Sequence, residues 1–414
     1  MYKDFLMHNT TDLYFFNPTC EYAVANGNAS WQANKLLRKM ENDLTTLPMF
    51  MARKNDYVLV ENPPSEEFIT SFKQIDIELP HFINWQNALS DKVFPNQPID
   101  RMCPWGWSPA AHKRLGPFKK NCSNNFKNSP VFEWKNEYRN FYSKKFGRSI
   151  LIDLIQKSPN QAFIATNNIA EVVTKKTEFE SLLVRWGKLM VKAPWSSSGR
   201  GLQPITKTPI HEKVWEKLLG IVAEQGYAIV EPYLNKVLDI AFQFKIFNSK
   251  VHFLGISNFT TDAKGQYYGN HLNGLPDSLD NATKVFVENI SPEIINSLIH
   301  VIESSDLAKN YEGNFGVDGL VYRNEDGELK INPCMEINLR QNMGLLALQL
   351  EKLLVPDKKG MYKMWHKPGH FFKDFKSEME LKHPLVITDG KISSGFLALT
   401  DAKADTLFGA YLLV

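Results

Sequence analysis

The sequence contains few cysteines and no cysteine motif. Its four cysteines, Cys20, Cys103, Cys122 and Cys334, are widely separated and form no C-x-x-C pair. A cysteine-based zinc site or a disulfide framework normally needs close, paired cysteines. We therefore expect four reduced thiols without a structural role in cross-linking.

Long apolar runs are also missing. No segment approaches the roughly 18 uninterrupted apolar residues that a membrane-spanning helix requires. The N-terminus, residues 1–5, lacks the basic start and apolar stretch of a secretory signal. The sequence therefore predicts a protein that neither spans a membrane nor is secreted, and the cytoplasm is the expected location.

Charge of one sign is not in excess. The chain carries 48 basic and 45 acidic residues, a formal net charge of +3. This balance argues against a general nucleic-acid or membrane surface, so any positively charged site must be local. Nucleic acid and membrane are accordingly not expected as partners.

Common nucleotide motifs are absent as well. No G-x-G-x-x-G occurs, and residues 201–208 lack the second glycine of a P-loop. Dinucleotide binding of the Rossmann type and P-loop chemistry are therefore not predicted. The sequence is long, with 414 residues, of which 43% are hydrophobic and 22% are charged. This composition predicts a globular protein, and the length predicts two to three domains.

Hydrophobic periodicity predicts an α/β protein. Residues 13–16 and 57–60 read as short buried strands, and residues 31–44 between them have helical spacing, which together predict a β-α-β unit. A helix is expected over 110–115, and the polar run 119–125 is the candidate linker that ends this first domain.

A second α/β region follows. Further strands are predicted at 162–165, 188–192, 228–231, 237–247 and 251–258, and further helices at 141–155, 179–186 and 292–307. A hairpin joins 316–322 to 329–338 across the turn 324–327. The polar stretch 258–273 is expected between strands, and residues 385–414 alternate short strands with turns, as either a lid or an edge extension.

Two strands of the hairpin carry oxygen ligands. Asp318 lies among apolar residues, and Glu336-Ile337-Asn338 alternates polar with apolar, so the carboxylates and the amide can point to the same side. Mg²⁺ prefers such ligands and is usually held by one or two carboxylates while substrate phosphates complete its shell. The motif therefore predicts a magnesium site beside a nucleotide triphosphate, with Arg340 facing phosphate or a developing oxyanion.

Lys192 ends an apolar strand and precedes a loop of small residues. Glycines let backbone N–H groups approach an anion, serines add hydroxyl donors, and a lysine adds a point charge, so the composition suits phosphate. By itself this run is equally compatible with an ordinary serine and glycine loop. The loop consists of Ser196, Ser197, Ser198, Gly199, Arg200 and Gly201.

The next buried strand ends at Glu231-Pro232-Tyr233-Leu234. Pro232 interrupts strand pairing and frees backbone groups that an adenine edge could use. Asp239 follows eight residues after Glu231 and could reach a ribose hydroxyl. A surface aspartate in a turn is the simpler alternative for that residue.

The order of these elements resembles the ATP-grasp superfamily over about residues 143–349. The resemblance implies an ATP-grasp fold of mixed α/β class with an N-terminal β-α-β domain and a short C-terminal extension. The implied boundaries are an N-terminal domain at 1–125, subdomain A at 126–235, subdomain B with the metal site at 236–375, and the extension at 376–414.

The resemblance also assigns roles to residues. It implies that Lys192 contacts the α- and β-phosphates, that Arg340 is catalytic together with Lys192, and that the 196–201 loop closes over the γ-phosphate. Either Lys144 or Lys145 would be a second phosphate lysine, a choice that the sequence leaves open. The adenine and ribose residues would be Glu231, Tyr233, Leu234 and Asp239, and the metal ligands Asp318, Glu336 and Asn338.

The implied activity is ligation of a carboxylate to an amine through an acyl phosphate. The cofactors would be ATP and Mg²⁺, with Mn²⁺ as an alternative metal, and the partners would be a small carboxylate and a small amine, an amino acid or short peptide at family level. A homodimer is compatible with the family. Two alternatives stay open: a catalytically silent ATP-binding or scaffold protein, and a small-molecule kinase on the same fold.

Overall fold

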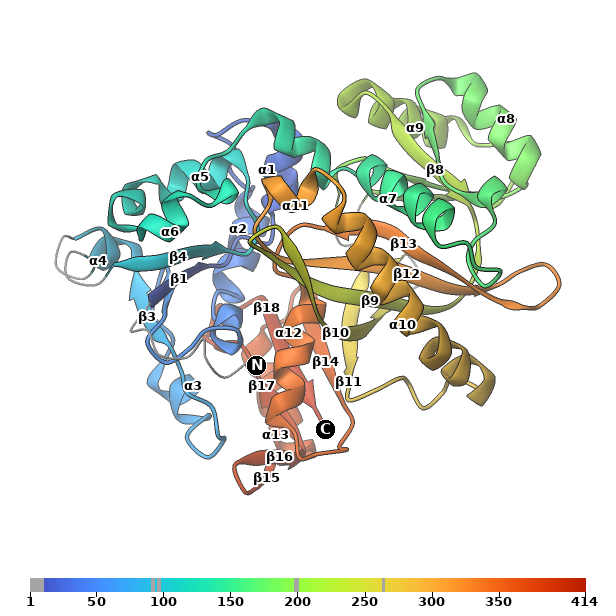
Figure 1. Ribbon diagram of the computed structural model, residues 1–414. Coiled ribbons are helices and arrows are strands. Elements are labelled where there is room, and N and C mark those ends of the chain that lie inside the picture. Colours follow the sequence, from blue (N-terminus) through green and yellow to red (C-terminus); the bar gives the residue numbers. More distant parts are fainter. Residues whose placement is uncertain (1–10, 91–93, 95–97, 197–200, 263–264) are drawn as a thin grey trace.

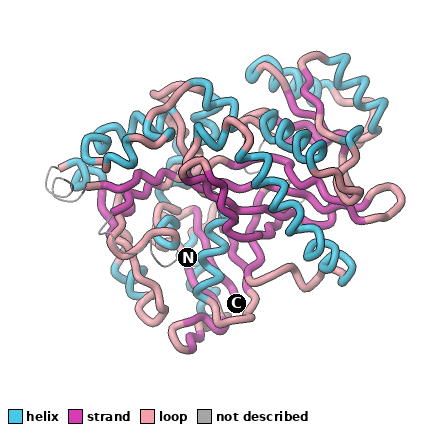
Figure 2. Tube along the Cα trace, viewed as in Figure 1, coloured by secondary structure: helices cyan, strands magenta, loops and turns pink. Residues whose placement is uncertain are grey.

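The protein is described by a computed structural model that covers residues 11–90, 94, 98–196, 201–262 and 265–414. Three sheets of four or more strands lie side by side and carry helices on their faces (Figure 1). Figure 2 shows the strands of the largest sheet running through the centre of the molecule, with helices along its outer side. This architecture confirms the predicted mixed α/β class.

The N-terminal sheet is parallel and has the order β3-β2-β1-β4. The predicted strands at 13–16 and 57–60 are confirmed as β1 and β2, and the intervening helical pattern is α2, which begins after the N-cap Asn34. The strands are β1 (Thr11–Phe15), β2 (Tyr57–Val60), β3 (His81–Asn84) and β4 (Ile99–Pro104), and the helices are α1 (Cys20–Asn26), α2 (Lys35–Asp43), α3 (Glu66–Thr70), α4 (Trp85–Leu89), α5 (Pro109–Leu115) and α6 (Asn124–Lys127).

A small four-stranded sheet with its own core forms the upper right of Figure 1. Its order is β5-β8-β6-β7, with antiparallel pairing throughout. The strands are β5 (Glu171–Val173), β6 (Leu189–Lys192), β7 (Leu202–Ile205) and β8 (Ala228–Pro232), and the covering helices are α8 (Lys176–Trp186) and α9 (Glu212–Gln225). The predicted strands at 188–192 and 228–231 and the helix at 179–186 are therefore confirmed.

The largest sheet has eight antiparallel strands in the order β13-β12-β9-β10-β11-β14-β18-β17. Its first half confirms the predicted meander and hairpin. The strands are β9 (Asn235–Phe247), β10 (Lys250–Thr261), β11 (Tyr267–Leu272), β12 (Gly313–Arg323), β13 (Leu329–Asn338), β14 (Gly360–His366), β17 (Phe396–Ala398) and β18 (Phe408–Leu413), and α7 (Lys144–Lys157) and α10 (Asn281–Glu303) cover one face.

The C-terminal residues extend this sheet. Strand β18 pairs with β14 and β17, so the edge-extension alternative is confirmed. Leu397 and Leu412 share one core with Phe16 and Leu47, which joins the end of the chain to the N-terminal domain. The remaining elements are α11 (Leu307–Asn310), α12 (Met343–Leu350), α13 (Phe372–Lys382), β15 (Val386–Thr388), β16 (Lys391–Ser394) and the 3-10 helices η1 (Leu47–Phe50), η2 (Gly116–Asn121), η3 (Pro130–Phe132), η4 (Asn136–Tyr142), η5 (Thr166–Asn168) and η6 (Glu351–Leu353).

The predicted linker at 119–125 is wrong. This run is part of η2 and α6, and Phe118, Cys122 and Phe126 are buried in the main core. The polar residues face solvent while the aromatic residues that flank them anchor the segment. The polar composition of this segment therefore wrongly indicated a linker where the chain forms a packed helical connection. The domain boundary at 125 stays a prediction.

Three element predictions also need correction. Residues 162–165 form no strand, because Phe163 makes only an isolated bridge to Ile331. The helix predicted at 292–307 begins at Asn281 and keeps Pro292 inside, since a buried apolar face offsets the hydrogen bond that proline cannot make. Most of the described part of the polar stretch 258–273 lies in β10 and β11.

A buried histidine makes folding pH-dependent. His112 stacks on Trp107 with ring centroids 4.4 Å apart, its Nδ1 atom has no hydrogen-bond partner among the described residues, and burial lowers its pKa from 6.5 to about 3. The unfolded chain therefore binds a proton at this residue at a higher pH than the folded protein does. The contribution of neutral His112 to stability is complete above about pH 6.5 and is lost as the pH falls toward 3.

We expect His112→Phe to remove much of this dependence while keeping the stacked ring. Between pH 8 and pH 5 the wild type should lose about 2 kcal/mol of unfolding free energy through His112, a loss that the variant lacks. Urea unfolding at both pH values measures the difference. His300→Gln, which changes an exposed histidine, is the control and should keep the wild-type slope. Equal pH dependence in His112→Phe and wild type would contradict the assignment.

Candidate functional site

Alternating side chains of β9 and β10 line a cavity of about 530 Å³. On β9 these are Asp239, Ala241 and Gln243, and on β10 they are Ser257, Phe259 and Thr261. Successive strand residues point to opposite faces, so every second residue of these two stretches faces the cavity. Residues from β6, β7, β8, β12, β13 and α12 complete the walls.

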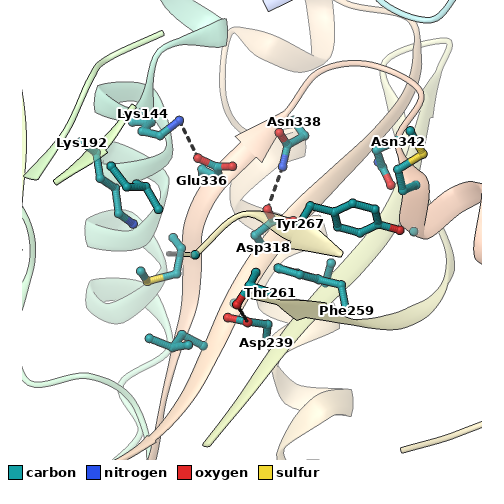
Figure 3. A pocket seen from close by; sticks show the side chains of 18 of the residues that line it. Lys144, Lys192, Asp239, Phe259, Thr261, Tyr267, Asp318, Glu336, Asn338 and Asn342 are labelled. Atoms are coloured by element: carbon teal, nitrogen blue, oxygen red, sulfur yellow. Dashed lines mark hydrogen bonds and ion pairs between the residues drawn. The ribbon is translucent and has the colours of Figure 1, made fainter. Parts of the chain in front are cut away.

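The predicted oxygen ligands lie together in this cavity. Asp318 of β12 and Glu336 of β13 are direct cross-strand partners, and Asn338 donates through Nδ2 to Asp318 Oδ2 at 3.0 Å (Figure 3). Desolvation and the neighbouring Glu336 carboxylate raise the pKa of Asp318 to about 8. Two ionised carboxylates this close raise the free energy of the folded protein unless a cation is bound, so the arrangement fits a cation site.

This cluster offers two carboxylates and one amide as ligands for a divalent cation. In the described residues no group of three or more His, Cys, Asp or Glu side chains is arranged to hold a metal ion. Asn338 Oδ1 accepts from Arg340 Nη2 at 3.0 Å, so binding of a cation by this amide requires it to turn. Substrate phosphates usually supply the other ligands of Mg²⁺, which suits so small a protein set.

Arg340 connects the cavity to the N-terminal domain. Its Nε atom donates to Glu21 Oε1 of α1 at 2.7 Å, and both side chains are mostly buried. This pairing raises the already high pKa of Arg340 against the cost of burial, so the guanidinium stays charged. The predicted catalytic cation is thus oriented by a carboxylate of α1, far from it in the sequence.

Two lysines point into the cavity, each paired with a glutamate. Lys192 Nζ lies 2.7 Å from Glu231 Oε1, and Lys144 Nζ lies 2.7 Å from Glu336 Oε2. Burial raises the pKa of Glu231, whereas Lys144 and Lys192 outweigh burial and lower the pKa of Glu336. Figure 3 shows both lysine ammonium groups on the same side of the metal-ligand cluster.

The choice between Lys144 and Lys145 is informed by this geometry. Lys144 lines the cavity and also donates to the backbone oxygen of Ser196 at 2.8 Å. Lys145 instead lies over the ring of Tyr227, 5.7 Å from its centroid. Lys144 is therefore the residue that can reach a phosphate, and its role stays a prediction.

The predicted loop is only partly described. Ser197, Ser198, Gly199 and Arg200 lie outside the described residues. Ser196 lines the cavity, and Gly201 approaches it so closely that a Cβ at Gly201 would lie 2.3 Å from Ser196 Oγ. Only glycine fits at 201 without displacing Ser196.

The cavity also has apolar side chains of the kind that a planar ring requires. Tyr233 and Leu234, predicted to contact adenine, line the cavity, and Tyr233 is half exposed. Asp239 also lines the cavity and accepts from Lys236 at 2.7 Å and Thr261 at 3.2 Å. The apolar lining consists of Met190, Leu202, Pro204, Leu320 and Met335.

Several cavity residues were missed by the sequence reasoning. Their polar members lie on strands or at a helix start, and one signal was present: Gln243 interrupts the otherwise apolar residues 240–244. Trp105 lies edge-on to Phe16 and also lines the cavity. The residues that the sequence reasoning missed include Gln243, Ser257, Asn342, Met343 and Gly344.

Comparison by sequence finds no relative. No protein-family model matches the chain, and no curated protein is similar to it in sequence. Among the described residues, no helix is long and apolar enough to cross a bilayer. Similarity is found only among solved structures.

Three solved structures illustrate that similarity. The complex of biotin carboxylase from Campylobacter jejuni with β,γ-ATP has a TM-score of 0.50 at 11% identity, and the match covers 97% of this chain and 86% of the carboxylase chain. N5-carboxyaminoimidazole synthetase from Staphylococcus aureus with ADP has a TM-score of 0.48 at 14% identity, and the match covers 98% of this chain and 93% of the synthetase chain. D-alanyl-alanine synthetase A from Vibrio cholerae has a TM-score of 0.42 at 12% identity, and the match covers 83% of this chain and 94% of the other chain. The similarity to the biotin carboxylase shows a shared fold over nearly the full chain, and at 11% identity it shows the fold alone.

Proposed function

The chain has the ATP-grasp fold, and from this premise we propose that it is an ATP-dependent ligase that joins a carboxylate to an amine. The observation that carries the proposal is the single cavity lined by Lys144, Lys192 and Arg340 together with two carboxylates and an amide. Phosphoryl transfer needs positioning and neutralisation of charge more than a protein nucleophile. These side chains would supply fixed cations and metal ligands in one place.

The lysines and the apolar lining of the cavity support ATP as the nucleotide. Lys192 and Lys144 would hold phosphate oxygens, and the apolar side chains with Tyr233 and Leu234 would receive adenine. Asp239 would accept from a ribose hydroxyl. When bound, Mg²⁺ would neutralise phosphate charge while held by the cluster of Asp318, Glu336 and Asn338.

The proposed reaction has two displacements. A substrate carboxylate oxygen attacks the γ-phosphorus, the bond to the β,γ-bridging oxygen breaks, and ADP leaves. The amine then attacks the acyl carbon, an amide bond forms, and inorganic phosphate departs as the nitrogen loses a proton. Arg340, held by Glu21, would stabilise the negative oxygen that develops at each stage.

We expect substrate-dependent release of ADP and inorganic phosphate. ³¹P NMR of the full chain with Mg²⁺ and ATP, incubated with pools of amino acids and dipeptides, measures it, and dividing an active pool identifies the substrates. Formation of AMP with pyrophosphate would contradict the acyl-phosphate route. A stable phosphorylated product formed without amine would instead indicate a kinase, and tight ATP binding without turnover in every pool would indicate a silent binder.

Other features stay predictions. These are the cytoplasmic location, a homodimer, Mn²⁺ as an alternative metal, and the boundaries of the subdomains. Division of the active substrate pool described above would identify the carboxylate and the amine.

A further inference from the structure

Two aromatic side chains of the cavity belong to none of the hydrophobic cores found among the described residues. Phe259 of β10 and Tyr267 of β11 line the cavity, are only partly buried, and have ring centroids 6.4 Å apart. An aromatic side chain that packs in no core leaves apolar surface for another molecule to cover. Small-molecule sites are lined in this way, because the ligand buries the surface that the protein leaves open.

Contacts within the largest sheet bring Met343 to these rings. The Tyr267 hydroxyl donates to Asn270 Oδ1, and Asn270 is the cross-strand partner of both Phe259 and Tyr362. The Tyr362 hydroxyl in turn donates to the sulfur of Met343 at 3.2 Å, and Met343 also lines the cavity. Side chains directly opposite each other on neighbouring strands share one face of the sheet. Phe259, Tyr267 and Met343 therefore border the same part of the cavity.

Two residues next to strands of the N-terminal sheet complete this part of the cavity. The backbone N–H of Gln341, two residues before α12, donates to the backbone oxygen of Trp105 at 2.7 Å. Asn17 Nδ2 donates to the backbone oxygen of Gly106 at 2.8 Å, which brings the neighbouring Pro18 close to Trp105. Both Pro18 and Trp105 line the cavity. We define the apolar wall as Pro18, Trp105, Phe259, Tyr267 and Met343.

The apolar wall is separate from the side chains assigned to adenine. In the largest sheet, β9 lies between the strand of Asp318 and the strands of Phe259 and Tyr267. Figure 3 shows both rings on the side of Asp318 away from Lys144 and Lys192. The adenine candidates instead come from the small four-stranded sheet, the residues after β8, and β12 and β13. The cavity thus has two apolar linings from different elements, and adenine requires only one.

The polar groups beside the apolar wall are engaged with one another. Asn270, which accepts from the Tyr267 hydroxyl, is fully buried and donates through Nδ2 to a backbone oxygen of β10 at 3.1 Å. Asp239, the cross-strand partner of Phe259, accepts from Lys236 at 2.7 Å. A charged group placed against the wall would therefore lose its hydration without gaining a partner.

We infer that the apolar wall holds an apolar, ring-sized side chain of one of the two substrates; the inference rests on the function proposed above. As seen from the two phosphate lysines, the wall lies beyond Asp318, where a substrate that meets the γ-phosphate would extend. The substrate class is therefore a carboxylate or an amine with an aromatic or branched aliphatic side chain. Burial of one such side chain changes binding about ten- to hundredfold.

Binding of small probes tests the inference without turnover. Saturation-transfer NMR would use the full chain with Mg²⁺ and a saturating non-hydrolysable ATP analogue, which fills the nucleotide site. The carboxylate probes are 3-phenylpropionate and its charged match succinate, and the amine probes are phenethylamine and its charged match 1,3-diaminopropane. We expect the ring-bearing probe of at least one pair to bind about ten- to hundredfold more tightly than its match. The pair that shows this preference identifies the substrate that the wall holds.

Three variants assign the preference to the apolar wall. Phe259→Ala should remove most of it, and Phe259→Leu, which keeps an apolar side chain, should remove less. If Phe259→Ala does not fold, Phe259→Leu alone decides. Phe253→Ala is the matched control, because Phe253 is on the same strand but is 37% exposed and outside the cavity lining, so the preference should persist. Affinity for the ATP analogue is measured in parallel for every variant.

Each outcome supports or overturns the inference. A ring preference that falls in the Phe259 variants and persists in Phe253→Ala supports it. No ring preference in either pair, or an unchanged preference in the Phe259 variants, overturns it. An equal loss of affinity for the ATP analogue also overturns it, because the wall would then belong to the nucleotide site. A ring preference that depends on Phe259 in a protein without ATP turnover would leave the subsite standing while the ligase proposal fails.

Discussion

Glu336→Gln should abolish Mg²⁺-dependent ATP turnover while leaving the protein folded. The substitution keeps the size of the side chain and one oxygen, but it removes the negative charge that Lys144 now pairs with at 2.7 Å. Loss of a single fixed electrostatic contact to a transition state costs roughly 10²–10³-fold in rate. We expect a fall of at least that size, measured as release of ADP and phosphate with the active pool.

The control for Glu336→Gln is on the same strand pair. Glu328, before β13, pairs with Lys330 at 2.9 Å but is exposed, so Glu328→Gln removes a comparable ion pair outside the cavity. It should retain wild-type turnover. Full turnover in Glu336→Gln would contradict the assignment of this carboxylate as a metal ligand, and thermal unfolding of both variants verifies that the fold survives.

Lys192→Met should weaken ATP binding and destabilise the protein at once. Methionine keeps the length of the buried stem but removes the charge expected at the α- and β-phosphates, for which we expect about 10²-fold loss of turnover. It also leaves Glu231 buried without its cation, and breaking a buried pair from one side costs about 3 kcal/mol.

A double variant separates these two effects. Lys192→Met with Glu231→Gln leaves no unpaired charge, so unfolding free energy from urea titration should return toward the wild-type value. ATP affinity from calorimetry should stay low, because the phosphate cation is still missing. Recovery of ATP binding together with stability would show that Lys192 acts only as a structural partner of Glu231.

The sequence predicted most of the fold because its hydrophobic periodicity was clear. Residues 57–60 and 228–231 are short apolar runs bounded by turns, and both are strands as predicted. The start of the helix predicted at 292–307 was wrong because Pro292 suggested a helix start, whereas the buried face of the helix continues before it. The linker predicted at 119–125 was wrong because the segment is polar in composition but is anchored by buried residues. Burial depends on contacts distant in sequence, which local patterns do not record.

The cavity was predictable in part for a similar reason. Asp318, Glu336 and Asn338 were found because their strands are neighbours in the chain and their spacing matches the pleat. Lys144 could not be chosen over Lys145 because only the packing of α7 on β13 directs it toward Glu336. Hydrogen bonds join Gln243 to Ser257 and to Asn342, and no local pattern connects positions so far apart in the sequence.

The pairing of each cavity lysine with a glutamate has a consequence for how ligands enter. Without nucleotide, Lys144 neutralises Glu336 and Lys192 neutralises Glu231, so the cavity already balances its own charges. A cation that binds Glu336 sets Lys144 free for phosphate, and a phosphate that takes Lys144 sets Glu336 free for a cation. Under the proposed function, metal and nucleotide would compete with the same internal pairs, and each would lower the free-energy cost of binding the other. We therefore expect the metal–nucleotide complex to bind more tightly than either species alone, through thermodynamic linkage.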